Sequence, residues 1–183
     1  MNSEIRGCAA ALAGVLLCAC AGVALGADEA SLSNQSFVEK AAQDGMAEVQ
    51  LGQIALSKSH DSDVRAFANR MVSDHDKANV ELKSVAKEAD VQAPTELDAE
   101  HRAMVDQLKS KSDTEFDAAY AKAMADDHTK AVSMFQSASS SQDLDPALAA
   151  FAKKTLPTLK EHKEMADSLA AGEHTASTGE GTD

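Results

Sequence analysis

Two segments of the chain place a histidine in the same sequence context. Residues 67–78 read FANRMVSDHDKA and residues 120–131 read YAKAMADDHTKA, so each segment carries an Asp-His pair three residues after a methionine. A looser third copy occurs at Glu161 and His162. Imidazole and carboxylate groups are ligands for divalent transition metals. The repeated pair therefore indicates metal chemistry, provided that the histidines meet in the folded chain.

The neighbouring apolar residues predict that these histidines face the protein interior. In all three segments the histidine continues a series of mainly apolar residues spaced three or four positions apart, which is the spacing of one helix face. The inward histidines are His75, His128 and His162. An earlier segment has no histidine, but its inward series contains one acid, Glu48.

The same four residues are expected at similar depths in a bundle of antiparallel helices. Counted from the expected helix ends, Glu48 and His128 lie about 15 Å deep, His75 about 18 Å and His162 about 24 Å. We therefore predict that these four side chains bind one divalent metal ion, which could be Zn, Fe, Mn or Cu. We expect three acids to accept hydrogen bonds from the imidazoles of neighbouring helices and so to orient these rings. The acids are Asp74, Asp127 and Glu161.

Two other interpretations of the inward residues stay open. They could form only a polar packing network, in a non-catalytic envelope protein with a structural or stress-related role. They could also belong to a metal-assisted enzyme. The sequence shows no Ser-His-Asp context and no glycine-rich phosphate loop, so we nominate no catalytic residue and no site for an organic cofactor.

The elements that must position these residues are helices. Ala, Lys, Glu, Leu and Met dominate the chain, and no segment shows the alternation typical of strands. Long helices are expected over 37–58, 63–89, 113–138 and 146–171, with a short helix over 95–109. Short polar loops between the long helices predict an all-α, up-down-up-down four-helix bundle, with the short helix in the second-to-third crossing.

The first 26 residues are expected to be a signal peptide. An apolar run without charge extends from Cys8 to Ala27, and the small residues at 24 and 26 suit cleavage before Ala27. A second interpretation is that Leu17-Cys18-Ala19-Cys20 is a lipobox, which would leave a lipid anchor on Cys20. The protein is therefore expected in the periplasm, or associated with the outer membrane if it is lipidated.

The rest of the chain is expected to form one domain. We predict a disordered linker over 27–35, the bundle over 36–171 and a disordered tail over 172–183. All three cysteines precede residue 21, so no disulfide is expected in the mature chain. The formal net charge of −13 argues against a nucleic-acid partner. No membrane-spanning segment is expected after cleavage, and the sequence identifies no protein partner.

Four stretches of the chain resemble a large family of exported bacterial proteins. They read FVEKAAQDGMAEVQLGQIAL, VRAFANRMVSDHDKAN, AYAKAMADDHTKAV and FAKKTLPTLKEHKEMA. The family is a domain of unknown function with a ferritin-like four-helix core, often labelled as outer-membrane or exported proteins. The resemblance implies the bundle but no established activity. Ferritin-like di-iron proteins use Glu-x-x-His motifs, whereas Val72, Ala125 and Leu159 precede the three histidines by three residues here. Di-iron chemistry is therefore not expected.

Export can be tested by the intact mass of the protein isolated from the cell envelope. We expect a chain that starts near Ala27, or a lipidated chain that starts at Cys20. Under lipidation the Cys20→Ser variant should leave the membrane fraction, whereas under ordinary cleavage it should behave as the wild type. A cytoplasmic protein that keeps Met1 would contradict both forms of the prediction.

Overall fold

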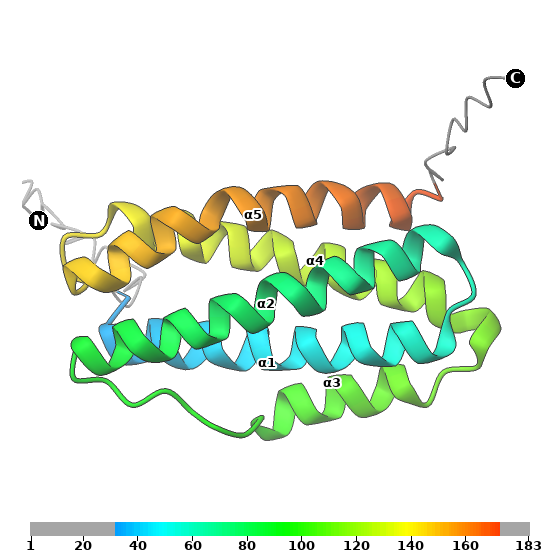
Figure 1. Ribbon diagram of the computed structural model, residues 1–183, viewed down its shortest axis with the longest axis horizontal. Coiled ribbons are helices and arrows are strands. Elements are labelled where there is room, and N and C mark those ends of the chain that lie inside the picture. The colour runs from blue at the N-terminus through cyan, green and yellow to red at the C-terminus, as the bar shows by residue number, and fades with distance from the viewer. Residues whose placement is uncertain (1–31, 173–183) are drawn as a thin grey trace, which may run out of the picture. The chain divides into compact units, whose positions relative to one another are not determined.

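The protein is described by a computed structural model over residues 32–172 (Figure 1). These residues form five α-helices and include no strand, which confirms the all-α class. The helices are α1 (Asn34–Lys58), α2 (Ser62–Glu88), α3 (Ala99–Lys109), α4 (Asp113–Ser140) and α5 (Pro146–Ala170). The predicted signal peptide, the possible lipid anchor at Cys20, most of the linker and the tail after Gly172 lie outside the described residues.

Side-chain caps set the first residue of several helices. α1 begins three residues before the predicted position because Ser33 is its N-cap, and the side chains of Ser33 and Ser36 bond reciprocally to each other's backbone N–H. The last residues of the predicted linker, Asn34 and Gln35, are therefore helical. α5 begins as predicted, with Asp145 accepting from the backbone N–H of Ala147 at 2.8 Å.

The four long helices pack as two pairs, α1 with α2 and α4 with α5, and the ring closes where α2 meets α5 and α1 meets α4. Two apolar clusters fill the interior between them. One cluster joins the first part of α1, the last parts of α2 and α4 and the first part of α5, as shown by Phe37, Leu82, Phe135 and Leu148. The other cluster joins the last parts of α1 and α5 with the first parts of α2 and α4, as shown by Leu51, Phe67, Phe116 and Ala166.

The predicted up-down-up-down order is wrong, because α2 and α4 run in the same direction (Figure 1). The long helices follow an up-down-down-up order. The reason is the connection through α3, which returns along the bundle before α4 starts. Eleven helical residues in α3 cover about 16 Å, and the extended stretch over 89–98 covers up to about 30 Å. Together they can span the ~40 Å of α2, so the short helix forms part of a long crossover.

Polar contacts fasten α3 to α1. Nε2 of His101 lies 3.0 Å from Oδ1 of Asp44, and its Nδ1 lies 2.8 Å from Oδ1 of Asp98, the N-cap of α3. Gln43 donates to the backbone carbonyl of Glu96 at 3.1 Å and accepts from the backbone N–H of Asp98 at 2.9 Å. These contacts hold the crossover against α1, and the sequence patterns did not indicate them.

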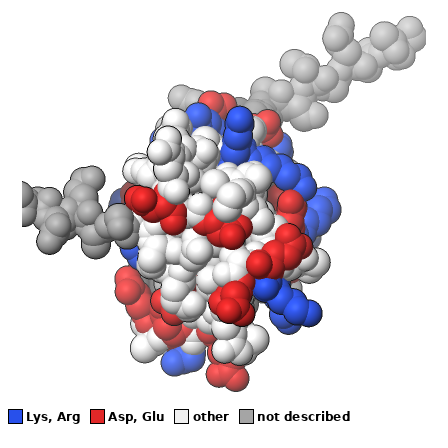
Figure 2. Space-filling view, turned by 90° about the vertical axis from the view of Figure 1, so that its left-hand side faces the viewer, with Lys and Arg blue, Asp and Glu red and all other residues white. Residues whose placement is uncertain are grey.

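The exterior of the described bundle is polar. No helix over residues 32–172 combines the length and the apolar character needed to cross a membrane. Acidic and basic side chains are interspersed on the end of the bundle that Figure 2 shows. Val80 is the one large apolar residue of the described chain that is strongly exposed, at 74 %.

The core assignment can be tested by truncating Phe67. This side chain is fully buried, with its ring centroid 6.0 Å from that of Tyr120 and 6.4 Å from that of His162. We expect Phe67→Ala to lower the free energy of unfolding by about 3–5 kcal/mol, because it leaves a cavity that the helices cannot close. Denaturant unfolding measures the loss. Val80→Ala on the exposed face is the control and should change stability by less than ~0.5 kcal/mol.

Candidate metal centre

Four ionisable side chains are buried near the middle of the bundle, one from each long helix. Glu48 is 2 % exposed, His75 is 5 % exposed, and His128 and His162 are fully buried. The inward orientation expected from the helical spacing is therefore confirmed for all four residues. Each lies near the middle of its helix, between the two apolar clusters.

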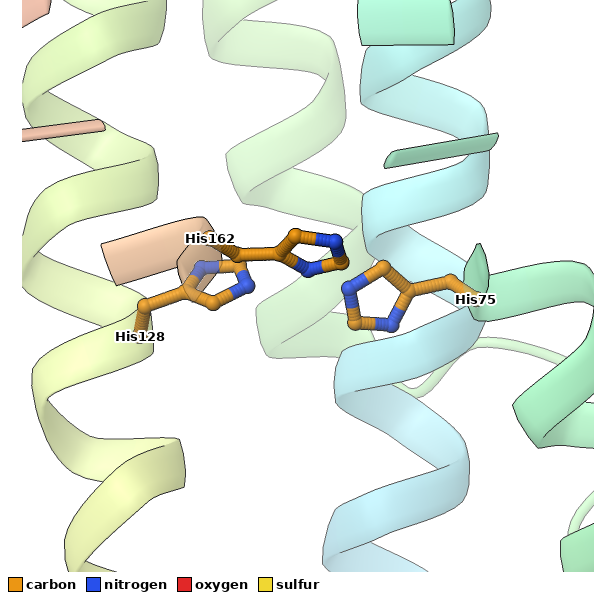
Figure 3. A group of neighbouring side chains, drawn as sticks. All are labelled: His75, His128 and His162. Carbon is orange, nitrogen blue, oxygen red and sulfur yellow. The ribbon is translucent and has the colours of Figure 1, made fainter. Parts of the chain in front are cut away.

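The three imidazole rings form a compact triangle. Their centroids are 5.6 Å apart for His75 and His128, 5.2 Å for His75 and His162, and 5.4 Å for His128 and His162. Each residue offers one ring nitrogen to a group in which all nitrogens lie within 4.8 Å of one another. Figure 3 shows these nitrogens facing the space between the rings. The three helices α2, α4 and α5 thus deliver three possible ligand atoms to one point.

The outer nitrogen of each ring faces an oxygen atom. Nδ1 of His75 lies 2.9 Å from Oε2 of Glu48. Nδ1 of His128 lies 3.0 Å from the backbone carbonyl of Met124 and 3.4 Å from Oε1 of Glu48. Nε2 of His162 bonds to Oδ2 of Asp74 at 3.1 Å. These oxygens favour a proton on the outer nitrogen and fix the direction of each ring.

The inner nitrogens have no hydrogen-bond partner within residues 32–172. They are Nε2 of His75, Nε2 of His128 and Nδ1 of His162, and all three are buried. With the protons held on the outer nitrogens, three lone pairs point toward a common space. A buried polar atom without a partner costs about 1–3 kcal/mol, so the arrangement is unfavourable unless a proton, a polar molecule or a cation lies between the rings. A transition-metal ion could accept all three lone pairs.

Glu48 lies at a different place from the one expected of a fourth ligand. Its oxygens face the outer nitrogens of His75 and His128, whereas the group of three convergent ligand atoms contains histidine nitrogens alone. Its carboxylate is thus placed to orient two rings at once. The sequence placed Glu48 at the correct depth, but helical spacing does not specify which atom of a neighbouring ring a side chain will contact.

The three flanking acids occupy three different environments. Asp74 on α2 accepts from His162 on α5, which is the contact expected for an acid that orients the imidazole of a neighbouring helix. Asp127 lies close enough to Glu48 for its charge to raise the pKa of that carboxyl group, and its own Oδ2 is buried without a hydrogen-bond partner among the described residues. Glu161 makes no contact with the rings but forms an ion pair with Arg70 on α2.

Arg70 is the residue of this region that the sequence patterns missed. Its Nε lies 3.4 Å from Oδ2 of Asp74, and its other end pairs with Glu161. It therefore links the acid that holds His162 to α5, the helix that carries His162. The sequence contained one signal for this contact. Arg70 precedes Asp74 by four residues on one helix, and residues at i and i+4 are neighbours on a helix surface.

Burial sets the protonation of the cluster. It lowers the pKa of His75 and of His162 to about 4, and it also lowers the pKa of His128, although the charge of Glu48 acts in the opposite direction. Burial, reinforced by the charge of Asp127, raises the pKa of Glu48 well above its usual range. At neutral pH the imidazoles are therefore uncharged, which is the form that binds metals.

Asp74 behaves differently because it is less buried. Burial alone would raise the pKa of its carboxyl group, but the hydrogen bond with His162, and then that with Arg70, hold the pKa below its ordinary value. It therefore remains a carboxylate at neutral pH. The two acids that face the rings thus differ in the direction of their pKa shift, which is upward for Glu48 and downward for Asp74.

The fold and the cluster together define an all-helical protein with three histidines converging in its core. The chain belongs to the family described as "Domain of unknown function (DUF4142)", whose profile matches residues 21–169. This confirms membership of a family of unknown function. No match was found among curated protein sequences.

Solved structures with a similar fold include two helical proteins. A DUF305 fragment from Deinococcus radiodurans aligns with a TM-score of 0.65 and 16 % identity, over 76 % of this chain and 95 % of that one. CopM in the Cu(II)-bound form aligns with a TM-score of 0.63 and 16 % identity, over 78 % of this chain and 98 % of that one. At this level of identity the similarity establishes the fold.

The protonation of the cluster predicts a pH-dependent stability for the metal-free protein. As the pH falls from about 6.5 toward 4, the unfolded chain protonates its histidines while the folded chain keeps His75 and His162 neutral. Protons then favour unfolding, so stability is lost as the pH falls through this range. Glu48 acts in the opposite sense, because the folded protein takes up that proton first.

A comparison of variants isolates the contribution of one histidine. Between pH 7 and pH 5, the wild type should lose about 1–2 kcal/mol more free energy of unfolding than His162→Phe, because the variant has no buried imidazole at this position. Urea unfolding of the metal-free proteins at both pH values measures the difference. Equal losses would contradict the assignment of His162 as a neutral buried histidine.

Proposed function

We propose that this protein is an exported helical-bundle protein that binds one divalent transition-metal ion through His75, His128 and His162. The observation that carries the proposal is the convergence of three buried ring nitrogens, none of which has a hydrogen-bond partner in the part of the chain that the structure describes. A single Lewis acid satisfies all of them at once. A packing network alone would be expected to pair these atoms with donors, because buried polar atoms are rarely left without partners.

In this proposal Glu48 and Asp74 orient the ligands and do not bind the ion themselves. Their oxygens face the outer nitrogens of His75, His128 and His162. Such outer acceptors fix the tautomer and increase the basicity of the ligating nitrogen. Arg70 in turn positions Asp74. A role of Glu48 as a fourth ligand, as the sequence suggested, is the alternative within the same site.

The donor set favours a borderline transition metal. Neutral imidazoles suit Zn, Cu, Fe and Ni, whereas Mg and Ca prefer oxygen ligands. CopM, a protein of similar fold, has a structure in the Cu(II)-bound form, which supports testing Cu(II) first and Zn(II) beside it. Three nitrogens leave a coordination position for a water molecule or another small ligand.

We further infer a ferritin-like relation of the helices. Two antiparallel pairs joined by one long crossover are the arrangement of ferritin-like bundles, and the contacts of the long helices and the course of α3 support it. Di-iron chemistry does not follow from this relation. Val72, Ala125 and Leu159 occupy the positions where Glu-x-x-His motifs would need acids.

Metal titration of protein purified without an affinity tag tests the proposal. We expect one Cu(II) or Zn(II) per chain at neutral pH, measured by calorimetry and elemental analysis. His75→Asn and His128→Asn keep a donor near the outer Nδ1 position and remove the inner nitrogen, while His162→Gln does the same for a ring held through Nε2. Each variant should lose stoichiometric binding. His60→Asn in the exposed loop is the matched control.

The outcome separates the alternatives. One equivalent bound by all three core variants would leave only the polar packing network, provided that circular dichroism shows them folded. Glu48→Gln keeps an oxygen next to the rings, so as an orienting residue it should weaken binding by about 10–100-fold. Complete loss of binding in Glu48→Gln would instead identify Glu48 as a ligand.

A further inference from the structure

A small cavity between the four long helices reaches Glu48 and, from the histidine cluster, His75. Its volume is about 20 Å³, which is room for one water molecule. The polar residues that line it are Asp44, Glu48, His75, Asn79 and Thr155. Glu48 and His75 are buried, whereas the Asp44 side chain is 24 % exposed. The cavity thus connects the buried polar residues to ones that solvent can touch.

A larger groove lies outside this cavity. It has a volume of about 230 Å³ and lies between α1, α2 and the segment that precedes α3. The residues that line it include Met46, Lys83, Pro94 and Thr95. Asn79 and Leu82 line both the groove and the inner cavity. These two side chains therefore form the partition between the groove and the cavity that reaches His75.

Gly45 provides the space that the Asn79 side chain occupies. A Cβ atom at position 45 would lie 2.2 Å from Oδ1 of Asn79, so the amide fills the volume that any other residue would need. Within residues 32–172 no hydrogen bond to the Asn79 amide is formed. Rotation of this side chain therefore breaks no protein hydrogen bond, in contrast to the apolar Leu82, which is packed into the core cluster.

We propose that Asn79 is the gate through which water and a divalent cation pass from the outer groove to the histidine cluster. The part of this proposal that concerns the cation rests on the proposed function. When the amide turns away from Gly45, the groove and the cavity join. The cavity is too small for a fully hydrated ion, so oxygens of Asp44 and Glu48 would replace water molecules along the way. The negative charge of Asp44 also attracts cations to this side of the bundle.

The gate can be tested without any metal. In protein labelled with ¹⁵N-histidine, NMR measures the exchange of the His75 ring N–H with solvent. Asn79→Ala should speed this exchange about tenfold, which corresponds to a barrier lower by about 1.4 kcal/mol. The ring N–H of His162 faces Asp74, outside both spaces, and should keep its rate. Asn69→Ala, an exposed asparagine on the same helix, should change neither rate.

The same variants test the passage of the ion. In stopped-flow mixing with Zn(II) and with a chelator, Asn79→Ala should raise the rates of uptake and release by a similar factor, about tenfold. Asn79→Leu keeps the size but lacks the amide oxygen and should lower both rates. The dissociation constant should stay within about threefold of the wild type, because Asn79 contacts neither the ion in solution nor the ion bound by the three histidines.

The results separate this proposal from the function on which it rests. An unchanged His75 exchange rate in Asn79→Ala would overturn the gate, whether or not the protein binds metal. A change in only one of the two rates, and therefore in the dissociation constant, would also overturn it. A wild-type protein that takes up no ion would refute the proposed function, and the exchange experiment would still decide whether Asn79 controls access to the cluster.

Discussion

The contact of Glu48 with two imidazoles is the interaction on which the centre of this bundle depends. A carboxyl group and three histidines are removed from water at one level, and such groups are costly to bury without partners. Glu48 faces the outer nitrogens of His75 and His128, while Asp74 holds His162 from another side. The outer oxygens thus satisfy one nitrogen of every ring and leave the other nitrogen directed inward.

This polar layer divides the apolar interior into two clusters. One lies toward the start of α1 and contains three phenylalanine rings, those of Phe37, Phe135 and Phe151. The other contains Phe67 and Tyr120, and the ring of Phe67 packs edge-on against His162. Close packing on both sides restricts the rings to a few rotamers. The position of the inner nitrogens therefore follows from the apolar clusters as much as from the acids.

Helical spacing was sufficient to find the four buried residues, even though the predicted order of the helices was wrong. A residue near the middle of a long helix, such as His75 or His128, keeps nearly the same depth when the helix is reversed. The course of the crossover was not predictable in this way, because it depends on contacts such as that of His101 with Asp44. The place of Glu48 at the outer nitrogens depends on its rotamer, which spacing does not specify.

Burial has two opposite consequences for the histidine cluster. It removes the rings from water and leaves their inner nitrogens without partners, which destabilises the metal-free fold. The same burial lowers the pKa of His75 and His162, so their lone pairs are free of protons at neutral pH. A more exposed cluster would be easier to fold, but it would be protonated at a higher pH and its rings would be less constrained. The feature that weakens the fold is therefore the one that prepares the three nitrogens to act as ligands.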